Sequence, residues 1–115
     1  MKIIRDTIAL EEIRRMAAGM FGDLVKAVID VERELLAVNA ELHSDLESLL
    51  LNDGSKQQNL WGINLYPDIK GENFVEFDSI INIRPSQGNK SREVEAEETR
   101  RRITGIVEKR VNRES

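Results

Sequence analysis

Cysteine is absent from this sequence, and histidine, proline and aromatic residues are scarce. The lack of cysteine excludes disulfides, cysteine-ligated zinc, iron–sulfur clusters and thiol nucleophiles. An imidazole general base could only be His43, because it is the one histidine of the chain. Since aromatic residues make up only 4% of the sequence, leucine, isoleucine and valine must fill the core.

Long apolar runs are also missing. No stretch reaches the roughly 20 apolar residues that a membrane helix needs, and no run of signal-peptide length follows the first residues. The lack of cysteine suits a reducing compartment. These absences together predict a soluble, cytoplasmic protein with no membrane contact.

Charged residues are abundant, at 33% of the chain, and acidic ones prevail to give a net charge of −4. This balance disfavours nucleic acid as a partner, because sequence-independent binders need a basic surface. A length of 115 residues predicts one domain, 1–115, whose last residues, 112–115, fray. A core of this size is small, so a homodimer is compatible with the sequence.

Two periodicities organise the first half of the chain. Apolar residues recur at helical spacing between Leu10 and Met20, and an alternation typical of a strand follows from Leu24 to Val31. A second strand from Glu34 to Asn39 would form a hairpin with the first. The alternative is a single helix over residues 31–42, which residue propensities also allow. The β-branched residues of the first strand favour the hairpin.

The second half of the chain predicts a helix over residues 41–51, strands over 60–66 and 74–84, and a helix over 95–111. Gly105 weakens the last helix, and we expect it to allow close packing on the sheet. With a short strand at residues 2–5, the order is β-α-β-β-α-β-β-α. The predicted fold is α+β, a single-domain two-layer sandwich of three helices and a mainly antiparallel sheet of four or five strands.

The loop from Arg84 to Ser91 concentrates polar side chains on little apolar support. Arg84 offers a planar set of donors suited to a carboxylate or phosphate, and Gly88 lets the backbone approach a ligand. The candidate ligand-binding residues are Arg84, Ser86, Gln87, Asn89 and Ser91. The alternative is a structural, hydrogen-bonded loop in which Arg84 pairs with Glu76 or Asp78.

The segment Ile81–Ser91, which reads I-N-I-R-P-S-Q-G-N-K-S, resembles the signature I-N-I-R-P-S-Q-G-N-[KR]-S of a family of short bacterial and archaeal proteins. That family is catalogued as a domain of unknown function. Residues 20–28, 41–45 and 54–67 are similar to its members as well, so the resemblance covers nearly the whole chain. It departs at Ala9, where the resemblance implies a serine cap. The resemblance implies no activity, substrate or cofactor.

His43 is the second candidate, as an acid or base with nearby carboxylates. The segment Glu41-x-His43-x-Asp45 would place three polar groups on one face if it were extended, and Asp30 could join them. Zinc usually takes more nitrogen or sulfur ligands than this segment offers, so we predict neither a metal site nor a cofactor. The alternative is a structural histidine at a helix start.

Two further features have ordinary explanations. Trp61, the only tryptophan, would form a recognition surface with Asn64 and Tyr66 if it were exposed. We expect it instead to share the core face with Phe77. The basic run 100–102 could bind an acidic partner, but a solvated helix face with ion pairs such as Glu97–Arg101 and Glu98–Arg102 explains it better.

Two functional hypotheses follow. The first is a small module that binds an anionic ligand or a protein partner through loop 84–91. The second is a small enzyme that uses His43, nearby carboxylates and Arg84 on an anionic substrate.

Overall fold

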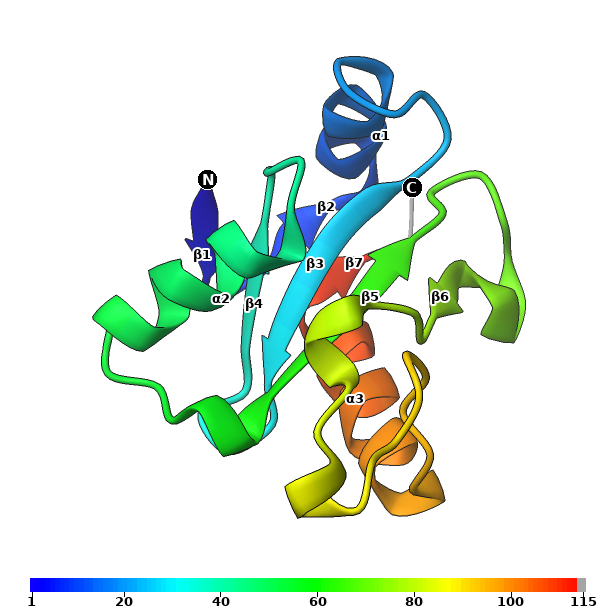
Figure 1. The fold of residues 1–115 in the computed structure, drawn as a ribbon. Coiled ribbons are helices and arrows are strands. Elements are labelled where there is room, and N and C mark those ends of the chain that lie inside the picture. The colour runs from blue at the N-terminus through cyan, green and yellow to red at the C-terminus, as the bar shows by residue number, and fades with distance from the viewer. Residues whose placement is uncertain (114–115) are drawn as a thin grey trace.

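A five-stranded antiparallel sheet forms the centre of the computed structural model, which describes residues 1–113 (Figure 1). The strand order is β1-β4-β3-β5-β6. The five strands are β1 (Lys2–Ile4), β3 (Val25–Asp30), β4 (Leu35–Val38), β5 (Leu60–Leu65) and β6 (Val75–Glu76). Two further strands, β2 (Ile8–Ala9) and β7 (Val111–Asn112), form a short parallel pair.

Helices cover both faces of the sheet. Residues of α1 (Leu10–Ala18) and α3 (Glu97–Arg110) share the larger apolar core with one face, and α2 (His43–Asn52) packs in a smaller core on the other (Figure 1). This confirms the predicted α+β class with three helices and an antiparallel sheet. The layering differs from the predicted two layers, because α2 adds a cover on the second face. Within residues 1–113, no helix combines the length and apolar character needed to cross a bilayer.

The hairpin β3–β4 is confirmed, and Asp30 explains how it turns without an Asn-Gly pair. One carboxylate oxygen of Asp30 accepts the backbone N–H groups of Glu32 and Arg33, each at 2.9 Å. Glu34 then adopts a left-handed backbone with φ of 56°. An aspartate that bonds the next backbone amides stabilises a tight turn by itself.

The predicted strand over residues 74–84 is wrong beyond its beginning. Only Val75–Glu76 pair as β6. The chain then leaves the sheet edge and forms two single-turn 3₁₀ helices, Ile80–Asn82 and Pro85–Gln87. The first of these packs over the backbone of β5, beside α2 (Figure 1).

Three smaller expectations also change. Gly105 is exposed, and a Cβ at this position would meet no atom within 4 Å, so it does not serve close packing on the sheet. Val111 and Asn112 pair with β2 instead of fraying, while residues 114–115 lie outside the described residues. Glu97–Arg101 forms at 3.4 Å, whereas Arg102 bonds to the Val31 carbonyl and pairs with Glu32.

Candidate functional site

The segment 79–91 is held against the edge of β5 by its own polar side chains. The amide of Asn82, which is fully buried, accepts from the Gly62 N–H at 2.8 Å and donates to the Gly62 carbonyl at 2.9 Å. It also donates to the Arg92 carbonyl at 2.9 Å. These are the contacts that a neighbouring strand would make through its backbone. Asn82 thus replaces a strand at the point where β6 has ended.

Gly62 is required for this close approach. A Cβ at Gly62 would lie 2.5 Å from the Cβ and 2.6 Å from the Oγ of Ser79. A real Cβ does not approach other atoms so closely, so only glycine lets the turn lie directly on β5.

Arg84 continues the same edge towards the start of β5. Its guanidinium donates to the backbone carbonyls of Ile81 (3.1 Å), Gln57 (2.7 Å) and Leu60. It lies 4.5 Å from the ring centre of Trp61, within the range of a cation–π contact. Arg84 is 8% exposed, and burial lowers its pKa below the usual range of an arginine. The predicted ion pair of Arg84 with Glu76 or Asp78 is wrong.

Asn89 closes the loop from the other side. Its backbone pairs with that of Arg84 in both directions, at 2.7 and 3.2 Å. Its amide donates to the Asn82, Ser91 and Glu93 carbonyls at 2.8, 3.1 and 2.6 Å, and accepts from the Glu95 N–H at 2.9 Å. Gly88 sits between the two paired residues with φ of 83°, a conformation that favours glycine.

The outward side of the segment has the opposite chemistry. Ile80 and Ile83 are 67% and 43% exposed, and Pro85, Ser86 and Gln87 are exposed as well. Ile80 begins the 3₁₀ turn Ile80–Asn82 and Ile83 directly follows it, and a spacing of three residues favours the same side of such a turn. We call the exposed residues of this segment, Ile80, Ile83, Pro85, Ser86, Gln87 and Gly88, the outer face.

The residues predicted to bind a ligand therefore divide into two groups. Arg84 and Asn89 are buried and bonded to backbone groups, while Ser86 and Gln87 are exposed. Gln87 accepts from Arg84 at 3.3 Å and donates to the Gln58 carbonyl at 3.1 Å. The Ser91 hydroxyl accepts from the Glu93 N–H at 3.2 Å. Ligand binding by these residues stays a prediction.

His43 begins α2 and lies on the face of the sheet that α2 covers. Its Nε2 is 2.8 Å from the Ile63 carbonyl. Because a carbonyl only accepts, Nε2 carries the proton and Nδ1 keeps its lone pair. Burial is the main reason that the pKa of His43 lies below its usual value; the hydrogen bond to Ile63 opposes this, and the Lys26 charge adds to it. His43 is thus neutral at pH 7.

The carboxylates predicted to assist His43 do not form a cluster with it, although Asp45 shares α2 with His43. Asp30 pairs with Leu60, three residues along β5 from Ile63 and therefore about 10 Å away, and Glu41 and Asp45 are exposed. Among the acidic side chains, Asp78 is the one whose charge raises the pKa of His43, against the larger lowering effect of burial. In the part of the chain that the structure describes, no three histidine or acidic side chains gather closely enough to hold a metal.

A polar cluster lies beside His43, and the hydrogen bonds that join its members were not predicted. Asn64 donates to Glu76 at 2.9 Å and to the Asp78 carbonyl at 3.3 Å, and Tyr66 donates to Glu76 at 3.0 Å. Arg92 donates to Asp78 at 2.7 Å. The sequence indicated Asn64 and Tyr66, which the alternation along β5 puts on the face opposite Ile63. Their contact with Glu76 joins two segments of the chain, and no local pattern shows it. Trp61 and Phe77 share the core as predicted.

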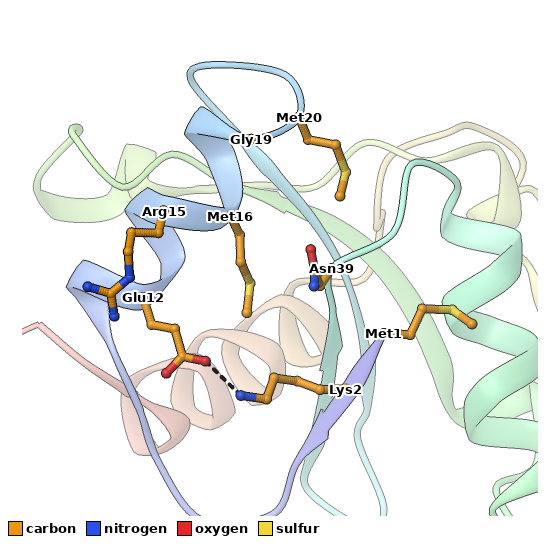
Figure 2. A pocket seen from close by; sticks show the side chains of 8 residues that line it. All are labelled: Met1, Lys2, Glu12, Arg15, Met16, Gly19, Met20 and Asn39. Carbon is orange, nitrogen blue, oxygen red and sulfur yellow. Dashed lines mark hydrogen bonds and ion pairs between the residues drawn. The ribbon is translucent and has the colours of Figure 1, made fainter.

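A hollow of about 510 Å³ lies apart from this site, between α1 and the N-terminal strand. Its rim carries the ion pair of Lys2 and Glu12 at 2.6 Å. All three methionines line it. Figure 2 shows Met16 and Met20 directed into the space and Met1 turned away from it. The three thioethers therefore do not converge on one point.

Comparison with known families gives one match. Residues 2–110 match the family described as "Protein of unknown function (DUF5674)". No curated protein and no solved structure matches the chain.

Proposed function

The chain belongs to the DUF5674 family, and we propose that it is a protein-interaction module whose binding surface is the outer face of residues 80–88. The partner that occupies this surface is a second copy of the chain. In this proposal Arg84 does not contact a ligand. Arg84, Asn82 and Asn89 hold the segment rigid, and the exposed side chains of the outer face contact the partner.

The inverted burial of the segment carries the proposal. Between Ser79 and Asn89, the polar side chains Asn82, Arg84 and Asn89 are buried while the isoleucines Ile80 and Ile83 face solvent. Buried polar groups and exposed large apolar groups are the two informative departures from ordinary burial. Their combination in one segment supports a surface that is built to be covered. A rigid segment also loses little conformational entropy on binding.

The charge of the segment supports a protein partner. One residue in three of the chain is charged, yet from Ser79 to Asn89 the only charged side chain is Arg84, which is turned inward. The outer face thus lacks the exposed cations that phosphate needs. A neutral apolar surface can meet its own copy without repulsion between like charges, and twofold symmetric dimers are the commonest assemblies of this kind.

Sedimentation equilibrium of the whole chain tests the proposal. We expect the average mass to rise with concentration towards twice that of the chain. Ile80→Asp and Ile83→Asp place a charge in the contact and should keep the protein monomeric. Ile69→Asp is the matched control, since Ile69 is 43% exposed, as is Ile83, and lies outside the outer face. If the wild-type protein stays monomeric up to about 1 mM, its free energy of association is weaker than about 4 kcal/mol. That result contradicts the proposal.

A second candidate function is proton transfer by His43. It is favoured by one observation, the fixed Nε2–H tautomer, which leaves the Nδ1 lone pair free to act as a base. Asp78, whose charge acts on the pKa of His43, would be the assisting acid in place of Asp30, Glu41 and Asp45. The guanidinium of Arg84 would not reach a substrate while it bonds to the carbonyls of Gln57 and Leu60. Slow reaction of His43 with diethyl pyrocarbonate, compared with free histidine, would argue against this candidate.

A further inference from the structure

Gly105 lowers the helix propensity of α3, and no close packing contact explains a glycine at this position. It lies in the interior of α3, where glycine is among the least favourable residues. It is exposed, and a Cβ at this position would meet no atom within 4 Å. Violations of local preference are expected where a function requires them. The missing side chain keeps space open on the outer side of α3.

That space is a hollow of about 630 Å³, of a size usual for binding sites. Gly105 and Thr104 line it from α3, and Phe77 contributes an aromatic wall. A second hollow of about 240 Å³ adjoins Gly105 on the side of Val31, and Arg101 borders both. Gly105 and Arg101 line both hollows, which therefore meet at α3 where the side chain is missing, and we refer to the two together as the trough. A trough of this shape suits an extended chain better than a compact molecule.

The charges of the larger hollow favour a cationic occupant. Four carboxylates and two guanidinium groups line it, which leaves two net negative charges. The side-chain carboxylates of Glu72 and Glu108 form no ion pair or hydrogen bond with any described residue. The Arg100 guanidinium is already engaged, since it stacks 4.9 Å from the ring centre of Phe77 and donates to the Val94 carbonyl. The unpaired carboxylates can therefore accept an incoming ammonium or guanidinium group.

We propose that this trough binds an extended segment of a partner protein, with its backbone over Gly105 and a lysine or arginine side chain between Glu72 and Glu108. The absence of a side chain at Gly105 lets the partner backbone approach α3 closely. This surface is distinct from the outer face of residues 80–88, so either one can fail without the other.

Selection from a random peptide library displayed on phage tests the proposal. The whole wild-type chain serves as bait, and the Gly105→Leu variant, whose side chain fills the trough, serves as the counter-bait. Leucine forms helices better than glycine and its Cβ meets no atom, so we expect the variant to melt no lower than wild type. The enriched peptide is then synthesised with a fluorescent label, and its affinity is measured by anisotropy.

We expect the enriched peptides to share a basic residue. Gly105→Leu should weaken the labelled peptide at least about tenfold, and Glu72→Gln and Glu108→Gln should weaken it about threefold each. Glu98→Gln removes an exposed carboxylate of α3 outside the trough and should leave binding unchanged. Any of three results overturns the proposal. The enriched peptides lack a basic residue, or the labelled peptide binds Gly105→Leu as tightly as wild type, or wild type enriches no peptide over that variant.

Discussion

Replacing Asn82 by alanine removes the side chain that takes the place of a strand beside β5. Three hydrogen bonds of 2.8 to 2.9 Å are lost. The Gly62 N–H and the Gly62 carbonyl lose the partner that Asn82 provides, while the Arg92 carbonyl keeps the Ser79 N–H at 3.0 Å. An unsatisfied buried polar group costs about 1–3 kcal/mol. Asn82 is fully buried, so water reaches the two Gly62 groups poorly. We therefore expect Asn82→Ala to lower the free energy of unfolding by about 3–5 kcal/mol.

Urea denaturation followed by circular dichroism measures this loss. With a slope of about 1.5 kcal/mol per molar urea, the midpoint should fall by about 2–3 M. Asn73→Ala is the matched control, because Asn73 is exposed and should change stability by less than about 0.5 kcal/mol. Asn82→Asp should cost at least as much at neutral pH, since a carboxylate would face two carbonyls. A loss below about 1 kcal/mol for Asn82→Ala would refute the edge-closing role.

Three further changes have definite expected results. Gly62→Ala should cost about 1–3 kcal/mol in urea denaturation, because its Cβ would lie 2.5 Å from that of Ser79, and adding Ser79→Gly should recover part of the loss. Ala9→Ser should raise the free energy of unfolding by about 1 kcal/mol, because Ala9 is the N-cap residue of α1 and makes no side-chain cap; no gain would contradict this. The folded-state pKa of His43 lies below 6.5, so its contribution to stability is full above pH 6.5 and is lost as the pH falls from there through the folded pKa. Wild type and His43→Gln, which can still donate to Ile63, should therefore differ in the slope of stability between pH 7 and 5, and equal slopes would contradict the buried neutral histidine.

The sequence predicted most of the fold because its elements carry clear periodic patterns. The helices around Ile13, Leu46 and Ile103 and the hairpin of β3 and β4 follow the apolar spacing closely. The strand over residues 74–84 failed although its alternation was equally regular. There, the tertiary contact of Asn82 with Gly62 replaces backbone pairing, and no local pattern encodes that a side chain will do so.

The segment 79–91 is distinctive in the sequence because polar residues concentrate there, but the direction of its side chains could not be predicted. The chemistry of Arg84 suggested an exposed anion binder, whereas its donors turn towards the carbonyls of Gln57 and Leu60. Gln57 and Leu60 lie 27 and 24 residues before Arg84 in the sequence, so the fold brings their carbonyls close to its guanidinium. Ile80 and Ile83 are large apolar residues, and hydrophobicity alone predicts burial for both. Their exposure emerges only in three dimensions.

Methyl spectra of isoleucine-labelled protein test directly whether the outer face is the contact between two copies of the chain. In a dilution series, the account predicts that the methyl resonances of Ile80 and Ile83 shift together with concentration, while that of Ile69 stays in place, because only the first two lie on the outer face. If the resonances of Ile80 and Ile83 do not move with concentration, or if only that of Ile69 shifts, the outer face is not the contact between copies.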